Sequence, residues 1–173
     1  MKKVIYTDYA KEALEHLQKG AFLCVSNAEL DNVMTISWGS IGNYWGKAHF
    51  MILVRYSRHT YKMLEDSKQF SISIPLNSNL KDALAKCGKL SGRDTNKWQE
   101  ANLTKIDAHE VNSKLVGECE LHFECKVVAR MPFEKEKIVE TKIENFYNNG
   151  DYHVLYYGEI LGTYLDKKGD VII

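Results

Sequence analysis

The sequence has no excess of charge of either sign, because its 173 residues include 23 Lys and Arg and 23 Asp and Glu. Proteins that bind nucleic acid through surface charge present a basic patch or stripe, and a balanced composition gives no sign of one. The charge balance therefore argues against nucleic acid as a partner.

Long hydrophobic runs are also missing. None approaches the roughly 20 residues that a helix needs to cross a bilayer, so no membrane partner is expected. The first residues, MKKVIYTDYAKE, contain two lysines but turn polar at once, which is not the pattern of a signal peptide. We therefore expect a cytoplasmic protein.

The four cysteines lack the spacing of a metal site, since none forms a CxxC pair and no two histidines stand at ligand spacing. No bound metal is expected. Cys119 and Cys125 are expected on one face of a strand as small core residues. Cys87 has two interpretations: a packing residue on the apolar stripe of a helix, or a redox thiol activated by nearby charge.

Proline is rare, with two residues, and no low-complexity run or linker divides the chain. What is present is typical of a folded globular protein, with 45% hydrophobic and 11% aromatic residues. A chain of this length buries roughly two-thirds of the surface that it exposes when unfolded. We therefore predict a single domain over residues 1–173.

The hydrophobic periodicity predicts a mainly β protein with short α segments. Strands are expected at residues 21–26, 33–39, 50–55, 69–75, 115–130 and 152–164. Helices are expected at residues 9–19, 58–66 and 79–86. Alternation within the strands places Ser71, Ser73 and His122 on outward faces. Six β segments with a few helices are typical of a closed or split antiparallel barrel.

Two later features are less regular. Residues 131–149 are charged and fit either a short helix or a strand over residues 136–143. Gly158 interrupts the last expected strand, which indicates a bulge or the close approach of another backbone or a ligand.

Within residues 32–61, the strands expected at residues 33–39 and 50–55 are joined through a glycine-rich turn at residues 40–46. Loops of this kind commonly carry binding residues. Thr35 and Ser37 share one face of the first of these strands, which fits either a solvated sheet face or a face turned to a ligand.

The exit from this stretch is basic and rich in hydroxyl groups. Arg55, Ser57, Arg58 and Thr60 lie within six positions, and Ser57 is expected as the N-cap of the following helix. A helix N-terminus has unpaired N–H groups and a partial positive charge, and arginine adds charge-assisted hydrogen bonds, so this pattern suits a phosphate. An ordinary capped helix with two surface arginines fits the same residues.

A polar loop follows at residues 87–98, with the sequence CGKLSGRDTNKW. It is poor in residues that pack into a core. It fits a polar ligand or a subunit contact, and it also fits a solvated surface loop.

Four segments together resemble one family. They are NVMTISW at residues 32–38, VRYSRHTY at 54–61, CGKLSGRDTNKW at 87–98 and GDYHVLYYGEI at 150–160. Their order is similar to that of the flavin reductase-like, FMN-binding split-barrel proteins, which include the flavoredoxins, over residues 19–161. The resemblance implies a six-stranded antiparallel Greek-key split barrel with flanking helices, which dimerises and holds FMN noncovalently near the subunit interface.

The resemblance also implies a set of site residues. The strand beside the isoalloxazine ring would comprise Met34, Thr35, Ile36, Ser37 and Trp38. The phosphate and ribityl contacts would be Arg55, Ser57 and Thr60, joined from the polar loop by Ser91, Arg93 and Lys97. His153 would lie near the flavin or the nicotinamide and is the candidate catalytic residue. Two positions depart from the family pattern: Tyr56 stands where many relatives have proline, and Tyr152 interrupts the usual GDH.

The function that the resemblance implies is that of an oxidoreductase. FMN carries the redox chemistry, so the protein needs neither a metal nor a nucleophile. Hydride would pass from NAD(P)H to the flavin N5, and electrons would then pass to a flavin or another acceptor. A flavoredoxin-like electron carrier with little NAD(P)H turnover and a non-catalytic FMN-binding module are the alternatives.

Overall fold

A computed structural model describes residues 1–166 of the chain. Its strands are β1 (Lys2–Lys3), β2 (Ala21–Ser26), β3 (Asp31–Ile36), β4 (Gly39–Tyr44), β5 (Lys47–Arg55), β6 (Gln69–Ile74), β7 (Lys105–Asp107), β8 (Lys114–Val116), β9 (Leu121–Pro132) and β10 (His153–Leu165). Its α-helices are α1 (Ala10–Leu17), α2 (His59–Ser67), α3 (Lys81–Lys89), α4 (Lys97–Glu100) and α5 (Thr141–Glu144). Three short 3-10 helices are η1 (Tyr6–Asp8), η2 (Lys135–Lys137) and η3 (Asn145–Tyr147).

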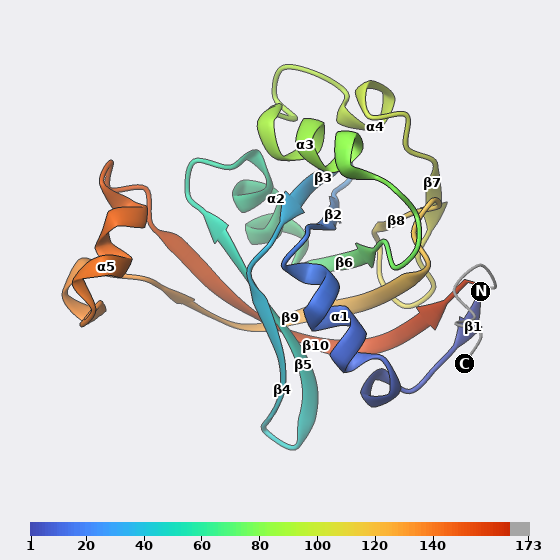
Figure 1. Cartoon of the computed structure of the whole chain (residues 1–173), viewed down its shortest axis with the longest axis horizontal. Coiled ribbons are helices and arrows are strands. Elements are labelled where there is room, and N and C mark those ends of the chain that lie inside the picture. Colours follow the sequence, from blue (N-terminus) through green and yellow to red (C-terminus); the bar gives the residue numbers. More distant parts are fainter. Residues whose placement is uncertain (167–173) are drawn as a thin grey trace.

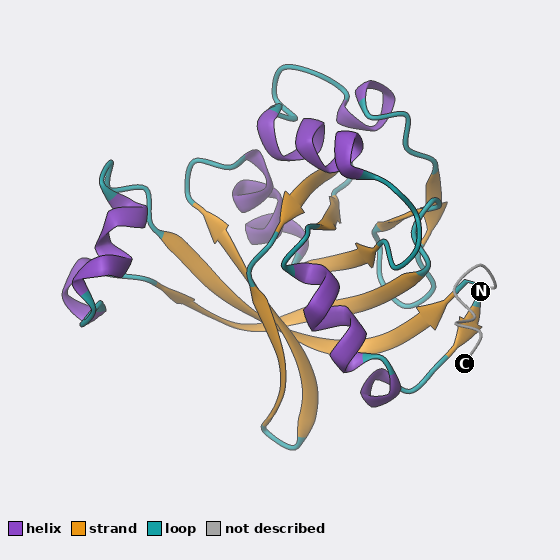
Figure 2. Cartoon of the chain, viewed as in Figure 1, coloured by secondary structure: helices purple, strands orange, loops and turns teal. Residues whose placement is uncertain are grey.

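One strongly curved antiparallel sheet organises the molecule (Figure 1). Its strands follow the order β3-β2-β6-β9-β10-β5-β4, and β1 pairs with β10 as an eighth strand. The predicted mainly β split barrel is therefore confirmed, with β1 and β4 added to the six strands expected. Helices α2, α3 and α4 gather at one end of the sheet (Figure 2).

Two apolar clusters form the core. The larger lies inside the curved sheet, where Phe50 and Phe123 pack edge to face at 5.1 Å between ring centroids. The smaller lies between β2, β3 and the helices α3 and α4 and includes Cys87 and Cys119. Cys125 belongs to the larger cluster, so the expectation that Cys119 and Cys125 share one strand face is wrong. Cys119 precedes β9 in a turn, although both thiols are buried as expected.

The glycine-rich turn expected at residues 40–46 is for the most part a strand. β4 occupies Gly39–Tyr44 and pairs with β5 down to Tyr44 and Lys47. Only Trp45 and Gly46 turn, with φ of 50° and 74°. Positive φ at both central residues is the geometry of a type I′ hairpin, which explains glycine at the second position. This hairpin projects at the bottom of Figure 1.

The face of β6 and β9 predicted to point outward is buried. Ser71, Ser73 and His122 are at most 1% exposed. The hairpin of β7 and β8 covers them: the Ser71 hydroxyl donates to the Lys114 carbonyl, and Ser73 accepts from the Val116 N–H. A single sequence shows alternation but not which segment covers the second face, and this caused the error.

The long strand expected at residues 115–130 is two strands, β8 and β9, separated by the turn at residues 117–120. Gly158 lies at a register shift between β9 and β10, as predicted. A Cβ at this position would lie 2.3 Å from Phe70 Cζ in the barrel core. Glycine is therefore required there by close packing.

Residues 133–152 form an arm that projects from the barrel between β9 and β10 (Figure 1). It holds η2, α5 and η3, so the helical alternative for residues 131–149 is the one observed. No helix within residues 1–166 is long and apolar enough to span a bilayer.

Candidate functional site

An open cleft of about 300 Å³ lies where the end of β5 and the start of β10 face the segment that leads out of β3. Its lining comprises Met34, Thr35, Ile36, Ser37, Trp38, Leu53, Arg55, Arg58 and His153. All five residues expected beside the flavin ring line this cleft, together with the candidate catalytic histidine. We call it the ring cleft.

A smaller cavity of about 90 Å³ adjoins the ring cleft, because Met34 and Arg58 line both. Its further lining comprises Ser57, His59, Thr60, Cys87, Lys89, Leu90, Ser91, Gly92, Arg93 and Lys97. We call it the basic cavity. The ring cleft also includes Arg55. The remaining predicted site residues all line the basic cavity: Ser57, Thr60, Ser91, Arg93 and Lys97.

The basic cavity lies at the start of α2, whose first turn has free donors. Arg58 is the N-cap residue and contributes no side-chain cap. The N–H of Tyr61 reaches the Arg58 carbonyl at 3.0 Å, whereas those of His59 and Thr60 have no partner within residues 1–166. The expected N-cap role of Ser57 is wrong, since its hydroxyl and its N–H both donate to the carboxylate of Asp151.

Four basic side chains line the basic cavity: Arg58, Lys89, Arg93 and Lys97. No carboxylate of the described residues lines it. The Arg93 guanidinium donates to the Ser57 carbonyl at 2.9 Å, and that of Arg58 donates to the Gly88 carbonyl at 3.2 Å. Both arginines are therefore held beside the cavity while keeping further donors available, because a guanidinium carries five N–H groups.

Lys97 is the most buried of these cations, with 4% of its surface exposed. Its ammonium makes one hydrogen bond within the described chain, to the Cys87 carbonyl at 3.2 Å. Burial lowers the pKa of Lys97 to about 8. A buried ammonium without a carboxylate is costly, so the site is one that an anion would stabilise.

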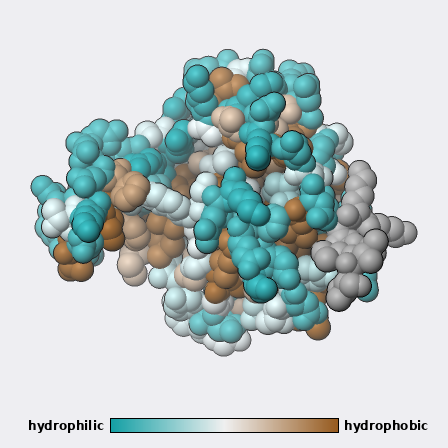
Figure 3. Space-filling view, in the orientation of Figure 1, coloured by the Kyte–Doolittle hydropathy of each residue, from teal (hydrophilic) through white to brown (hydrophobic). Residues whose placement is uncertain are grey.

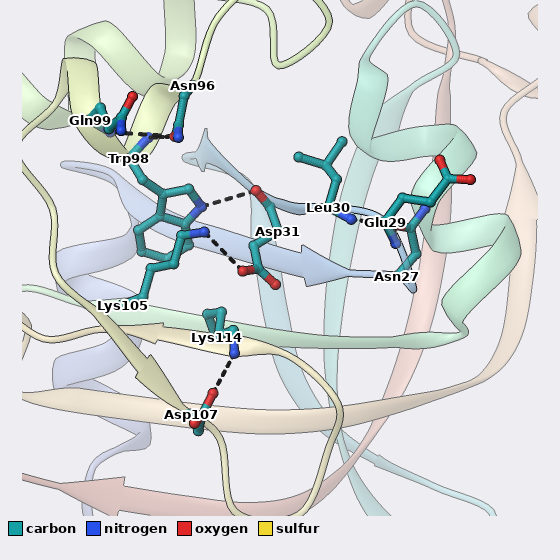
Figure 4. A network of polar contacts seen from close by, with 10 residues as sticks. All are labelled: Asn27, Glu29, Leu30, Asp31, Asn96, Trp98, Gln99, Lys105, Asp107 and Lys114. Atoms are coloured by element: carbon teal, nitrogen blue, oxygen red, sulfur yellow. Dashed lines mark hydrogen bonds and ion pairs between the residues drawn. The ribbon is translucent and has the colours of Figure 1, made fainter.

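A polar network surrounds α4, the helix whose first residue is Lys97 (Figure 4). The Asn96 side chain accepts from the N–H groups of Trp98 and Gln99 and caps the helix. The Trp98 indole N–H donates to the Asp31 carbonyl at 3.2 Å, and Lys105 pairs with the Asp31 carboxylate at 2.9 Å. These contacts tie α4 to the start of β3.

Close packing holds the polar loop against β3. A Cβ at Gly92 would lie 2.2 Å from Asn32 Oδ1, so any other residue there would displace the Asn32 side chain. The Asn32 amide in turn donates to the Thr60 hydroxyl at 2.8 Å. Thr35 donates its hydroxyl proton to the Leu84 carbonyl at 2.6 Å, which leaves only acceptor lone pairs on its oxygen.

Cys87 is 1% exposed, and burial raises the pKa of its thiol to about 11. The thiol therefore stays protonated at neutral pH. Of its two interpretations, this environment supports the packing residue.

The far wall of the ring cleft is aromatic. The Trp38 ring lies 5.2 Å from the rings of both Phe146 and His153. His153 Nδ1 is 2.9 Å from the Tyr147 hydroxyl, and burial followed by the charge of Arg55 lowers the pKa of His153 to about 4. The imidazole is therefore neutral at physiological pH.

Arg55 connects the barrel to the arm. Its guanidinium donates to the Asp151 carbonyl and, at 2.8 Å, to the Phe146 carbonyl, and it lies 5.1 Å from the Tyr147 ring. It lines the ring cleft but not the basic cavity. Its predicted phosphate contact stays a prediction.

Comparison with protein families gives a match over residues 14–168 to the flavin reductase like domain. The chain belongs to the flavin reductase-like family. A protein from Archaeoglobus fulgidus, described only as uncharacterized, is 32% identical over 155 residues, which are 87% of this chain and 77% of that one.

Solved structures of flavin reductase-like proteins share the fold. The flavoredoxin from Methanosarcina acetivorans superposes with a TM-score of 0.69 at 20% identity, over 88% of this chain and 70% of that one. An FMN-binding protein from Thermus thermophilus gives 0.66 at 21% identity, over 87% and 74%. The flavoredoxin from Desulfovibrio vulgaris (Miyazaki F) gives 0.67 at 19%, over 86% and 70%.

Within this flavin reductase-like chain, sequence reasoning missed several site residues. His59 and Lys89 line the basic cavity, and both stand inside the motifs that carried the resemblance. Tyr147 and Asp151 contact the site from the arm. The charged, irregular arm sequence gave no signal of this; Tyr147 contacts His153 six positions away, whereas Asp151 contacts Ser57 94 positions away.

Proposed function

We propose that this chain binds FMN noncovalently, with the isoalloxazine ring in the ring cleft and the phosphate in the basic cavity. The observation that carries the proposal is the basic cavity itself: four cations and no carboxylate among its described lining, at the free N-terminus of α2, next to a cleft open enough for a flat ring. Helix N-termini with added basic side chains are established phosphate sites.

The two cavities contain hydrogen-bond donors without partners and an apolar surface, which match the phosphate and the ring of FMN. Lys97 is a buried ammonium with one carbonyl partner, and two backbone N–H groups at the start of α2 lack any within residues 1–166. A phosphate carrying close to two negative charges at neutral pH would satisfy these donors together. Met34 and Ile36 supply an apolar surface in the ring cleft, and Thr35 supplies an acceptor for a ring N–H.

We further propose that the protein is an NAD(P)H-dependent flavin reductase. FMN supplies hydride-transfer chemistry, and the protein supplies binding and orientation. The neutral His153 would contribute a hydrogen bond beside the reacting partners rather than an imidazolium charge, because its pKa is about 4. Arg55 would hold the arm so that Trp38 and Phe146 screen this end of the ring cleft from water.

A flavoredoxin-like electron carrier is the second candidate. Two of the similar structures are flavoredoxins, and this favours a chain that holds FMN tightly and reacts poorly with nicotinamide. Anaerobic titration of the FMN-loaded protein with NADH and NADPH separates the two. Rapid bleaching of the visible flavin band supports the reductase, whereas bleaching by dithionite alone supports the carrier. Protein that binds no FMN contradicts both.

We also propose that the chain forms a homodimer through the arm. Val139 is 98% exposed and Phe146 56%, Ile143 is exposed as well, and Met131 is exposed at the end of β9 next to the arm. Figure 3 shows apolar surface on the arm and where the arm meets the barrel. Such apolar surface on a projecting segment is typical of an interface. Light scattering after gel filtration should give twice the chain mass, and a monomer at micromolar concentration would contradict the proposal.

A further inference from the structure

The side chain of His59 has a buried nitrogen that the fold does not satisfy. Its Nε2 is inaccessible to solvent and has no hydrogen-bond partner in the described chain. Unpaired buried polar atoms are rare in folded proteins and often mark the place of an absent ion or ligand. His59 is also the first residue of α2, so it stands at the helix end where the basic cavity lies.

His59 separates two spaces. It lines the basic cavity on one side and a larger groove of about 630 Å³ on the other. The polar loop presses on its ring, since a Cβ at Gly92 would lie 3.2 Å from His59 Cδ2. The imidazole is thus held in the wall between the basic cavity and the groove.

The charges around His59 are mostly positive. Arg93 and Lys97 act on it from the polar loop and α4, and Lys62 from its own helix. Burial and then these three charges lower the pKa of His59, which favours the neutral imidazole in the free protein. On the groove side, Glu29 and Asp66 also line the wall. An anion in the basic cavity would offset the positive charges of Arg93 and Lys97. The charge around His59 would then favour the protonated imidazole.

We propose that His59 takes up one proton from solvent as the flavin phosphate enters the basic cavity, and then binds the phosphate as an imidazolium. The inference rests on the proposed function, because it assumes that the anion belongs to FMN. Protonation gives both ring nitrogens an N–H, so the orphaned Nε2 becomes a charge-assisted donor. His59 would then be a specificity residue for the phosphorylated flavin.

Proton uptake makes the affinity depend on pH. By linkage, the FMN affinity gains up to about tenfold per pH unit as the pH falls between the bound-state and free-state pKa values of His59. Lys97 and the phosphate also titrate in this range, the phosphate with a second pKa of about 6. Both remain in a His59 variant, so the ratio of variant to wild-type dissociation constants isolates His59.

The test compares His59→Gln with the wild-type chain in FMN and riboflavin binding at pH 8.5, 7 and 6. His109→Gln is the matched control, because His109 is exposed and contacts Tyr164 outside both cavities. We expect the FMN ratio for His59→Gln to rise from about one at pH 8.5 to about ten at pH 6. Riboflavin, which lacks the phosphate, and His109→Gln should give ratios near one throughout.

A second measurement keeps the inference independent of FMN. Histidine NMR signals followed through a pH titration, with and without inorganic phosphate, should show the His59 pKa rising when phosphate is added. A flat FMN ratio, an equal rise with riboflavin, or a His59 pKa that ignores phosphate overturns the inference. Wild-type protein that binds no FMN while its His59 still responds to phosphate defeats the proposed function alone.

Discussion

At the scale of single residues, Lys97 carries an electrostatic cost that the described chain does not offset with a carboxylate. The fold buries its ammonium without a carboxylate, and the pKa near 8 expresses that cost. Replacing a poorly compensated buried charge with an apolar side chain of similar length often stabilises a protein. Under the proposed function, stability and phosphate binding therefore make opposite demands on Lys97.

Lys97→Met should raise the thermal midpoint of the free protein and weaken FMN binding by about tenfold to a hundredfold, with riboflavin binding little changed. The charge-assisted bond to phosphate is lost, while the apolar stem remains. Differential scanning fluorimetry and fluorescence titration measure the two effects. Lys86→Met is the control, because Lys86 bonds the Glu100 carbonyl outside the cavity. Unchanged FMN affinity would remove Lys97 from the phosphate site.

Substitution of Gly92 and of Gly88 by alanine should have different effects on stability. Gly92→Ala should destabilise the protein by about 1–3 kcal/mol, because its Cβ would lie 2.2 Å from Asn32 Oδ1 and force Asn32 away from Thr60. A Cβ at Gly88 would meet only the Thr35 side chain, with Cβ at 3.5 Å and Oγ1 at 3.7 Å, and Gly88 lies within α3, so Gly88→Ala should be neutral or stabilising. Urea unfolding measures both, and equal effects would refute the packing argument.

At the scale of elements, the sequence predicted what depends on local order. The strand at Ala21–Ser26 and the apolar stripe of α3 follow from periodicity, and the basic segment at the start of α2 follows from its residue types. It could not predict what covers the second face of β6 and β9, since Ser71 and His122 look the same whether water or β8 lies over them. The predicted N-cap role of Ser57 was wrong for a similar reason, because the Ser57 hydroxyl donates to the carboxylate of the distant Asp151.

The arm is tied to the barrel by the Arg55 guanidinium and by the bonds of Ser57 to Asp151. Arg55→Ala removes the bonds to the carbonyls of Phe146 and Asp151, so residues 133–152 should become more sensitive to limited proteolysis. Loss of the aromatic wall of the ring cleft should lower FMN and riboflavin affinity by similar factors, about tenfold. The folded barrel should remain, as judged by circular dichroism.

The matched control for the arm is Arg130→Ala, since Arg130 forms a surface ion pair with Glu65 at 3.3 Å and lies outside both cavities. A loss confined to FMN would instead support the direct phosphate contact predicted for Arg55. If neither flavin binds more weakly, Arg55 has no part in the site.

At the scale of the whole molecule, buried histidines couple stability to pH. Burial lowers the pKa of His122 to about 4, and its ring nitrogens contact Ser73 and the Cys119 carbonyl. The unfolded chain binds the proton near pH 6.5 and the folded chain only near pH 4. Stability is therefore fully present above pH 6.5 and falls as the pH drops towards 4.

Urea unfolding at pH 7, 6 and 5 should show this fall, with a slope of up to about 1.4 kcal/mol per pH unit for each such histidine. His153, with a pKa of about 4, adds a second contribution. His122→Gln should be less stable at pH 7 but should show a shallower pH dependence. A variant that keeps the full wild-type slope would show that His122 titrates normally.

The assembly of the site is also a property of the whole molecule. Motifs far apart in the sequence supplied its barrel residues, and the fold joins Met34, Arg58 and Lys97 around two adjoining cavities. The arm contributes Asp151, which bonds Ser57 94 positions away, and Tyr147, whose ring lies 5.1 Å from the Arg55 guanidinium. What local order and resemblance could carry was predictable, and what depends on long-range packing was not.

The central claim is that the basic cavity recognises a phosphate joined to a flat ring in the ring cleft. The most direct test is the ratio of riboflavin to FMN dissociation constants for the wild-type chain, measured by fluorescence titration at low and high salt. The account predicts that FMN binds one per chain and at least about a hundredfold more tightly, with the advantage shrinking as salt screens the exposed arginines. Equal affinities for FMN and riboflavin would contradict it.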